Sequence, residues 1–371
     1  MRIETFEMER WQSKWEHRVS YNLSESGVHP LSFEELVPRE ELERLLKLRL
    51  GYIQTNGTKE LKQRIMRYYP GAGEGNILVT TGSCEANFLL IFSLIEQGDE
   101  AVFMLPNFMQ IYGLLRAFGA EVKTFTLREE LRWMPDLSEL KRAITKRTKL
   151  ICITNPNNPT GARLNDEVRG AVIDLAKWAG AWLIVDEVYQ GAELDGRITP
   201  TFFGSYEKCI VVSGLSKAYG LPGLRVGWIV GPEKVIDKLW SYKDYTTITI
   251  SGPSDRLARL VLEPEMRERI LERTRRIIRG NLDILEGWIK ENGLFHLVPP
   301  SAGAIAFARY DLDINATELA HRVRERKGVL LQPGDQLGMD GYIRFGLGEE
   351  SDRFREALSL VGEELKELRA G

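Results

Sequence analysis

Cysteine and histidine are scarce in this sequence of 371 residues, and their positions exclude several common kinds of site. The three cysteines lie far apart, at positions 84, 152 and 209, and they form no C-x-x-C pair. This spacing favours buried, reduced thiols over a disulfide or a metal role. None of the four histidines has a catalytic spacing, although His29 remains an active-site candidate. We therefore expect no metal centre.

Long hydrophobic runs and an excess of one charge are also missing. No apolar run approaches the roughly 20 residues of a membrane helix, and the opening segment MRIETFEMERWQSKWEH contains no apolar signal core. The 50 basic and 53 acidic side chains give a net charge of -3. Such a balance provides no overall attraction to nucleic acid or to an anionic membrane. The sequence predicts a cytoplasmic protein with neither of these partners.

Short apolar runs alternate with helical patterns from residue 76 onward. Seven runs are rich in Val and Ile and bounded by Gly, Pro or charge: residues 76–81, 100–106, 121–127, 149–155, 181–187, 208–214 and 225–231. Helical patterns between them include residues 83–96, 107–118 and 165–180. This alternation predicts an α/β fold with a mostly parallel seven-stranded sheet and helices on both faces. The last two runs are too close for a crossover helix, so we expect them to form an antiparallel edge.

A different pattern follows the last of these runs and predicts a smaller α+β domain. Long charged helices are expected at 232–245 and 255–292, short strands with one helix near 316–327 come next, and a helix at 351–369 closes the chain. The first 45 residues fit neither sheet pattern. We expect a large domain over 46–265 and a small domain formed by both termini, 1–45 and 266–371.

Polar groups follow four of the predicted strands, at the edge where open parallel sheets bind ligands. The first is Gly82-Ser83-Cys84, at a helix start whose N–H groups and hydroxyl suit an anion such as phosphate. The others are NPNNPTG at 155–161, DEVY at 186–189 and SGLSK at 213–217. Since all four converge on one edge of the sheet, they predict a single site.

The residue types in these groups point to one cofactor. Asp186 follows an apolar strand, so its carboxylate needs a cationic partner, and its neighbour Glu187 would point the opposite way, which disfavours a metal site. Lys217, flanked by small residues, is a candidate amine for a Schiff base. Arg225, between glycines, suits a phosphate. The ligand groups that suit these three side chains are an aldehyde for Lys217, a pyridinium for Asp186 and a phosphate for Arg225. All three occur together in pyridoxal 5′-phosphate (PLP).

The motifs NPNNPTG, DEVY and SGLSKAYGLPGLRVGW, in this order and at these spacings, resemble those of the aminotransferase class I/II family of fold-type I, aspartate aminotransferase-like PLP enzymes. The resemblance extends from Tyr52 to Arg344. It implies that Lys217 forms the Schiff base and later moves a proton, that Asp186 contacts the pyridine nitrogen, and that Tyr189 and Asn158 contact the 3-oxygen of the cofactor.

The same resemblance implies the remaining contacts. Arg225, Ser83 and Cys84 would bind the phosphate, and Phe108 would stack on the ring. Tyr52 resembles a tyrosine that reaches the phosphate from a neighbouring subunit, which implies a homodimer with shared active sites. The expected substrate contacts are Gly27, Asn158 and Arg344, the last of which would hold the α-carboxylate of the substrate.

Two positions depart from the family pattern. The family commonly has Ser or Thr at the position of Gly214, so Ser216, or less directly Ser213, would supply the missing hydroxyl. Glu25 precedes the expected substrate-binding Gly27. It is either a salt-bridging surface residue or a group that faces a cationic substrate side chain.

The resemblance implies an aminotransferase that moves an amino group between an L-amino acid and a 2-oxo acid. The same constellation also serves C–S β-lyases, racemases and cyclising synthases, and these alternatives stay open. A PLP-binding regulatory module is a further alternative, which the absence of a helix-turn-helix pattern disfavours.

Overall fold

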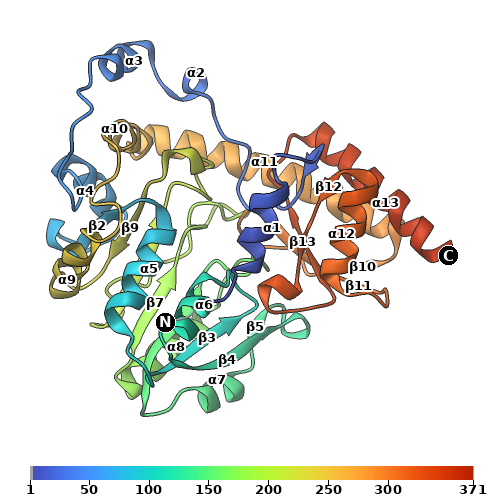
Figure 1. Ribbon diagram of the computed structural model, residues 1–371, viewed down its shortest axis with the longest axis horizontal. Coiled ribbons are helices and arrows are strands. Elements are labelled where there is room, and N and C mark those ends of the chain that lie inside the picture. The colour runs from blue at the N-terminus through green and yellow to red at the C-terminus, as the bar shows by residue number, and fades with distance from the viewer. Residues whose placement is uncertain (1–2, 371) are drawn as a thin grey trace.

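The computed structural model describes residues 3–370 and places eight strands in one large sheet (Figure 1). The strand order is β2-β9-β8-β7-β6-β3-β4-β5. The strands are Ile77–Thr80 (β2), Glu100–Leu105 (β3), Glu121–Arg128 (β4), Met134–Pro135 (β5), Thr148–Thr154 (β6), Trp182–Asp186 (β7), Cys209–Gly214 (β8) and Gly227–Val230 (β9). The predicted α/β class and its seven strands are confirmed.

Two features of this sheet differ from the prediction. The strand β5 was not predicted, because a two-residue strand carries no alternation; it pairs antiparallel with the end of β4. The strand β9 is antiparallel to β8, as expected, but it is not an edge, because β2 pairs with its other side. Its second partner lies far away in the sequence, where local pattern gives no information about pairing.

Alternate residues of the strands pack into two hydrophobic layers, one on each face of the sheet. In β6, Leu150 and Cys152 pack on one face with the helices α5 (Gly82–Leu94), α6 (Gln110–Ala117) and α9 (Glu233–Lys243). Ile151 and Ile153 pack on the other face, where the helices are α7 (Leu137–Ala143), α8 (Asp166–Ala179) and α10 (Gly252–Val261). Helices therefore cover both faces, as predicted. The helix α4 (Lys59–Met66) contacts α10 beside this sheet.

A second, antiparallel sheet has the order β10-β11-β14-β13. Its strands are Phe295–Leu297 (β10), Ile305–Tyr310 (β11), Gln332–Pro333 (β13) and Tyr342–Gly346 (β14), and the helices beside it are α12 (Ala316–Lys327) and α13 (Ser351–Ala370). The strand β1 (Tyr21–Asn22) pairs in parallel with β12 (Val329–Leu330), which brings the N-terminal part of the chain onto this region. The division into two domains at the predicted boundaries remains a proposal.

The predicted helix over 255–292 is two helices in the structure. The first is α10, and the second, α11 (Pro264–Asn292), begins with a proline. Proline has no N–H to donate and is tolerated only in the first turn of a helix. The chain therefore breaks before Pro264, and α11 runs from α10 toward the second sheet, where it contacts β10 and α13 (Figure 1).

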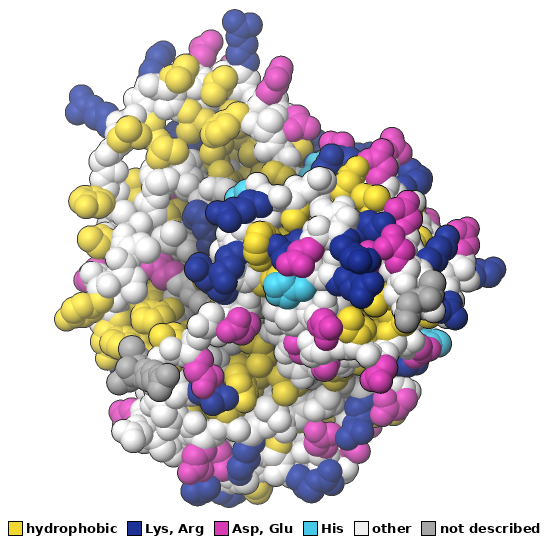
Figure 2. Space-filling view, turned by 45° about the vertical axis from the view of Figure 1, so that its right-hand side comes forward, with side chains coloured by type: hydrophobic (Ala, Val, Ile, Leu, Met, Phe, Trp, Pro, Cys, Tyr) yellow, Lys and Arg dark blue, Asp and Glu magenta, His cyan; other side chains and the backbone are white. Residues whose placement is uncertain are grey.

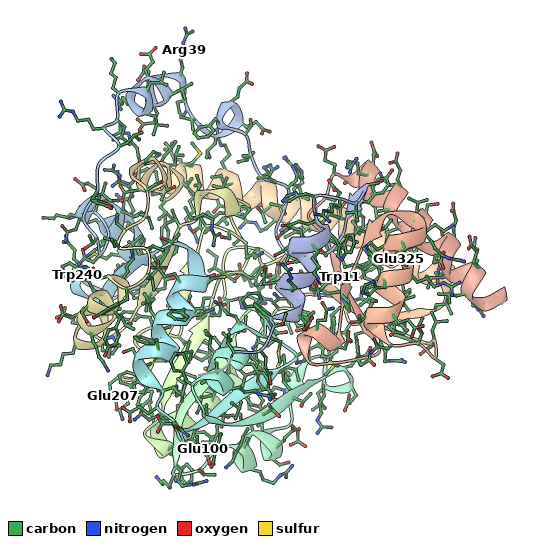
Figure 3. The ribbon with its side chains drawn as sticks, viewed as in Figure 1. Trp11, Arg39, Glu100, Glu207, Trp240 and Glu325 are labelled. Carbon is green, nitrogen blue, oxygen red and sulfur yellow. The ribbon has the colours of Figure 1, made fainter. Side chains whose placement is uncertain are left out.

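The N-terminal helix α1 (Glu7–Trp15) lies between the two sheets, whereas α2 (Phe33–Leu36) and α3 (Arg39–Leu46) form an arm at the top of Figure 1. Trp11, labelled in Figure 3, fixes α1 to the small-sheet region through two contacts. Its indole N–H donates to the carbonyl of Leu331 at 2.9 Å, and its ring packs on His321. The remaining elements are the 3-10 turns Glu74–Asn76, Glu129–Leu131, Pro222–Leu224 and Asp335–Leu337.

Across residues 3–370, no helix combines the length and the apolar character that crossing a bilayer requires.

Candidate active site

A cavity of about 330 Å³ lies at the carboxyl ends of β6, β7 and β8. It brings together residues from all four polar groups that follow the predicted strands. The predicted residues that line it are Ser83, Cys84, Phe108, Asn158, Asp186, Tyr189, Ser216, Lys217 and Arg225. Residues that lie up to 142 positions apart, from Ser83 to Arg225, thus face one space.

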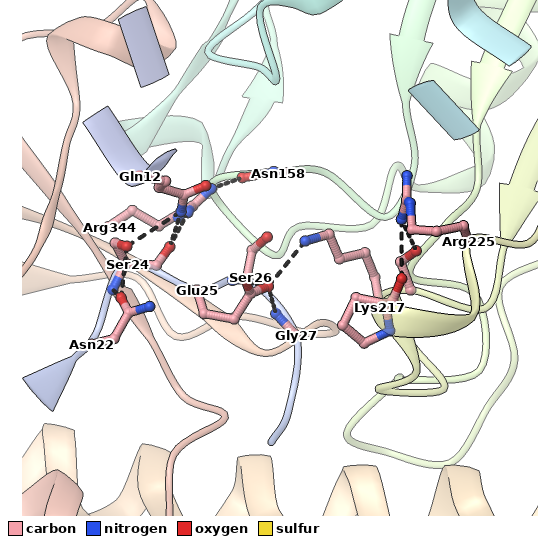
Figure 4. Close-up of polar contacts among 12 residues, drawn as sticks. Gln12, Asn22, Ser24, Glu25, Ser26, Gly27, Asn158, Lys217, Arg225 and Arg344 are labelled. Carbon is pink, nitrogen blue, oxygen red and sulfur yellow. Dashed lines mark hydrogen bonds and ion pairs between the residues drawn. The ribbon is translucent and has the colours of Figure 1, made fainter. Parts of the chain in front are cut away.

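Lys217 points across the cavity to Glu25 (Figure 4). Its Nζ donates to Glu25 Oε1 at 3.0 Å, and the same oxygen accepts the backbone N–H groups of Ser26 and Gly27. Burial alone would lower the pKa of Lys217, but the Glu25 carboxylate outweighs it and raises the pKa to about 12. Burial would raise the pKa of Glu25, and Lys217 instead holds it at about 2. The two groups form a charged pair inside the cavity.

Asp186 and Glu187 follow one another at the end of β7 but face opposite ways. Asp186 lines the cavity and accepts the N–H of Val188, while burial raises its pKa to about 6. Glu187 turns into the core, where it accepts the N–H of Phe202 at 2.7 Å and burial raises its pKa to about 8. In the part of the chain that the structure describes, no three His, Cys, Asp or Glu side chains could together hold a metal ion.

The Gly82-Ser83-Cys84 turn and Arg225 form one end of the cavity. Gly82 has a φ of +76°, and a Cβ there would lie 2.4 Å from Arg225 Nη2, so only glycine allows this approach. The free N–H groups at the start of α5 and the guanidinium of Arg225 thus meet at one point. Burial raises the pKa of the Cys84 thiol, which keeps it neutral.

Gly214, the departure from the family pattern, is explained by close packing between β8 and β9. A Cβ at this position would lie 2.8 Å from the carbonyl oxygen of Val226. Of the two candidate hydroxyls, Ser216 faces the cavity and accepts from Arg225 Nη1 at 3.5 Å. Ser213 is buried and donates to the carbonyl of Glu187. Ser216 is therefore the hydroxyl that can reach a ligand in the cavity.

The NPNNPTG loop is braced by its own side chains. Asn155 accepts the N–H of Leu164, and Asn157 accepts both the N–H and the hydroxyl of Thr160. Asn158 is left to face the cavity, where its oxygen accepts from Arg344 at 2.9 Å (Figure 4).

Arg344 reaches this point from β14 of the second sheet. It is 1% exposed and also donates to the carbonyl of Ser24. Burial lowers the pKa of its guanidinium. The buried hydroxyl of Tyr189 lies in the same cavity and has no hydrogen-bond partner in residues 3–370.

Arg344, which contacts the lining residue Asn158, lies outside the cavity lining itself, and so do three further candidates. Tyr52 is 83% exposed on the surface. Gly27 lies beside the cavity, and a Cβ on it would approach the carbonyl oxygen of Ser216 to 3.2 Å. His29 contacts Arg273 instead.

Sequence reasoning missed the contribution of α1 to this cavity. The additional lining residues are Met8, Glu9, Gln12 and Glu16 from the N-terminal segment, together with Ser26, Thr154, Val188 and Pro222. The spacing of Glu9, Gln12 and Glu16 is that of one helix face. That spacing marks a polar face, although it does not reveal what the face covers.

The residues present fit pyridoxal 5′-phosphate. The unpartnered hydroxyl of Tyr189 can donate to a phenolate oxygen, and the carboxylate of Asp186 needs a cation such as a pyridinium. Arg225, Ser216 and the start of α5 offer donors for a phosphate. Lys217 supplies the amine.

Comparisons with known proteins agree with this reading. The family model for aminotransferase class I and II matches residues 23–360. Capreomycidine synthase of Streptomyces vinaceus is 30% identical over 96% of this chain and 93% of its own length. Aspartate aminotransferase of Pyrococcus horikoshii is 27% identical over 85% of this chain and 83% of its own. The structure of a PLP-dependent aminotransferase from Streptococcus suis 89-1591 superposes with a TM-score of 0.93, at 33% identity and 99% coverage of both chains. The chain therefore belongs to the aminotransferase class I and II family, and it is a PLP-dependent aminotransferase.

Proposed function

We propose that the enzyme moves an amino group between an L-amino acid and a 2-oxo acid, with Lys217 as its central catalytic residue. The observation that carries this proposal is the position of Lys217 at the end of β8, in one cavity with Asp186, Tyr189 and Arg225. A cytoplasmic location and the domain boundaries stay as predicted from the sequence.

Separate residues hold the different parts of the cofactor. Arg225, Ser216 and the N–H groups of Ser83 and Cys84 bind the phosphate, because together they offer a cation, a hydroxyl and a helix start. Phe108 lines the cavity and would stack on the ring. When bound, PLP supplies an electron-withdrawing ring that stabilises negative charge at the substrate Cα.

Asp186, Tyr189 and Asn158 tune that ring. The Asp186 carboxylate, which burial destabilises, regains a cationic partner in the protonated pyridine nitrogen. The Tyr189 hydroxyl and the Asn158 amide, which line the same cavity, would donate to the ring oxygen. Together these residues would favour the ring form that withdraws electrons most strongly.

Lys217 and Arg344 act on the substrate. Arg344 binds the α-carboxylate through its planar fork, beside Asn158 and close to the backbone of Gly27. With PLP and substrate bound, the Lys217 amine would be the base that holds and moves the proton of the substrate Cα. Glu25, which accepts from Lys217 at 3.0 Å, orients that amine.

The site is completed by a second copy of the chain. Large hydrophobic side chains are exposed on the N-terminal arm and near α9: Phe33, Leu42, Leu46, Leu50, Tyr52 and Tyr245. Figure 2 shows hydrophobic side chains gathered at the upper left of the molecule, where the arm lies. A gathering of exposed hydrophobic side chains of this kind is typical of a protein interface. Tyr52 would reach the phosphate of the partner across it.

Substitution of Lys217 by alanine tests the proposal. The variant should lose the visible absorbance of the bound cofactor and nearly all turnover, because no other amine lines the cavity of the described chain. Lys141→Ala, on an exposed position of α7, is the matched control and should retain both. Full transamination by the Lys217 variant would disprove the assignment.

A second candidate is a cyclising synthase of the same fold, because one relative bears the name of a synthase rather than an aminotransferase. The products distinguish the two. An aminotransferase releases a 2-oxo acid in proportion to the amino group transferred, whereas a lyase releases pyruvate and ammonia and a synthase a cyclised amino acid. A visible absorbance of bound PLP that no amino acid changes would favour a PLP-binding regulatory module.

A further inference from the structure

The proposed contacts leave three carboxylates in the cavity without a cation. In the proposed complex, Arg225 would be matched by the phosphate, Arg344 by the α-carboxylate and Asp186 by the pyridine nitrogen, and Lys217 would be occupied by the cofactor. Among the described residues, Lys217 and Arg225 are the only cationic side chains that line the cavity. Glu9, Glu16 and Glu25 thus remain as uncompensated acceptors. This inference rests on the proposed function and concerns the substrate of the same site.

Glu9, Gln12 and Glu16 form one acceptor face of α1 and its C-terminal cap. Their spacing places them on the same side of the helix, and all three line the cavity. The side chain of Glu9 makes no ion pair or hydrogen bond with any residue in the range 3–370. Glu16 pairs at 3.5 Å with His17, whose side chain is 90% exposed. Among the described residues, neither Glu9 nor Glu16 pairs with a cationic side chain that lines the cavity.

Gln12 is an independent sign of a ligand. It is 8% exposed, and its Nε2 donates to the carbonyl oxygen of Ser24 at 2.7 Å. Its Oε1 accepts no hydrogen bond from the described residues, and Gln12 lines the cavity. An amide oxygen without a donor in the protein is free to accept from a ligand, and the two carboxylates beside it favour a positively charged one.

The helix holds these acceptors firmly in place. Trp11 is bonded to Leu331, and Trp15 lies 3.6 Å from the guanidinium of Arg324. At the start of α1, Phe6 packs edge-on against Phe108 at 5.1 Å. The acceptor face is thus fixed between the second sheet and the ring-stacking residue of the cofactor site.

We propose that the amino donor is a basic L-amino acid, whose side-chain guanidinium or ammonium is bound by Glu9, Gln12 and Glu16. Both groups carry only donors and a positive charge, which matches a face of two carboxylates and an amide oxygen. Glu25 lies between this face and Lys217 and adds to the negative potential. An acidic substrate side chain would meet carboxylates on every side of this region.

Burial supports the same assignment from the protein side. It raises the pKa of Glu9, and the nearby Glu25 and Glu16 raise it further against the opposing effect of Lys217 and Arg344. A buried carboxylate in this state gains from a bound cation.

The test compares amino acids that differ in charge but little in shape. The PLP-loaded enzyme is mixed with L-arginine or L-citrulline, and with L-lysine or L-norleucine, and the absorbance change of a single turnover gives kcat/KM. We expect kcat/KM for arginine and lysine to exceed kcat/KM for citrulline and norleucine by about tenfold to a hundredfold, the usual effect of a charge-assisted hydrogen bond. In Glu9→Gln and in Glu16→Gln, this ratio of charged to neutral kcat/KM should be about tenfold smaller. Glu7→Gln, exposed on the same helix and outside this cavity, should keep it.

A binding measurement separates this inference from the proposed function. In Lys217→Ala, which is not expected to turn over, arginine should raise the melting temperature more than citrulline, and adding Glu9→Gln should remove the difference. Equal kcat/KM values for the charged and neutral pairs would overturn the inference and leave the transaminase intact. No absorbance change with any amino acid would overturn the proposed function, and equal thermal shifts would then overturn the inference as well.

Discussion

At the scale of single residues, burial sets the charge of the acidic groups and their surroundings decide their use. Asp186 and Glu187 are neighbours on one strand, and burial raises the pKa of both. Asp186 faces the cavity, where a cationic ligand can restore its charge. Glu187 faces the core, where its Oε1 accepts from Phe202 and its Oε2 has no partner in the described chain. Asp186 is thus placed to bind a cationic ligand, whereas the surroundings of Glu187 favour its protonated, neutral form.

Glu187 should make the stability of the fold depend on pH. Its pKa rises from the usual 4.5 to about 8 in the native state, so the native protein holds a proton that the unfolded chain releases. The free energy of unfolding should therefore fall as the pH rises from about 4.5 to 8. In Glu187→Gln, the loss of melting temperature over this range should be smaller by at least about 2–4 °C, the shift for 1 kcal/mol in a domain of 150–250 residues.

The control for this prediction is Glu207→Gln, because Glu207 is exposed on the surface (Figure 3). Its pH profile should follow that of the parent protein. A Glu187→Gln profile that also follows the parent would show that Glu187 is ionised in the native state.

Gly214→Ser should destabilise the protein, although serine is common at this position in the family. The new Cβ would lie 2.8 Å from the carbonyl oxygen of Val226, and β8 and β9 would have to separate to admit it. Overpacking of this kind costs about 1–3 kcal/mol, measurable by urea unfolding. Gly223→Ser is the matched control, since nothing lies within 4 Å of a Cβ there. Equal stability of the two variants would contradict the packing explanation.

At the scale of elements, α1 connects the second sheet to the cavity. Its buried face carries Met8 and Trp11, and its adjoining face carries the acceptors Glu9 and Gln12. A helix of nine residues is not stable alone, so its position depends on these tertiary contacts.

Trp11→Ala should release α1 without unfolding the large sheet. It removes a side chain that is 5% exposed and leaves the carbonyl of Leu331 without its donor, a loss of about 3–5 kcal/mol. Amide hydrogen exchange should accelerate in residues 7–15 and stay slow in β6 and β7. Trp178→Ala, at a 50% exposed position of α8, should leave both regions unchanged. Unchanged protection of α1 in the Trp11 variant would mean that other contacts hold the helix.

The elements differ in how far the sequence could predict them. The strands β3, β6, β7 and β8 were predictable because each is a buried apolar run with clear boundaries. Four groups of site residues were predictable for the same reason, since they follow strand ends. The role of α1 was not, because its polar face becomes meaningful only once Trp11 contacts a carbonyl 320 positions away.

At the scale of the whole molecule, the arm formed by α2 and α3 exposes several large hydrophobic side chains. Leu46 is 80% exposed and Leu50 is 86% exposed, close in sequence to Tyr52. Their burial against a second copy would account for this exposure and for the position of Tyr52 outside its own cavity.

Leu46→Glu combined with Leu50→Glu should therefore shift the protein from two chains to one at micromolar concentration, and with it weaken cofactor binding. Light scattering after size exclusion measures the mass, and equilibrium dialysis measures bound PLP. Trp178→Glu introduces the same charge at another exposed hydrophobic position and should change neither. A two-chain mass for the double variant would place the interface elsewhere.

Each of the two sheets positions a different part of the site. The large sheet positions Lys217, Asp186 and Arg225. The second sheet carries Arg344 on β14, and the acceptor face of α1 is fixed to the strands beside it. For protein engineering, this separation means that residues 3–27 and the second sheet, which carry most of the proposed substrate contacts, form a cassette. Transplanting that cassette between relatives would carry a new preference into the same chemistry, with the strand ends that perform it left untouched.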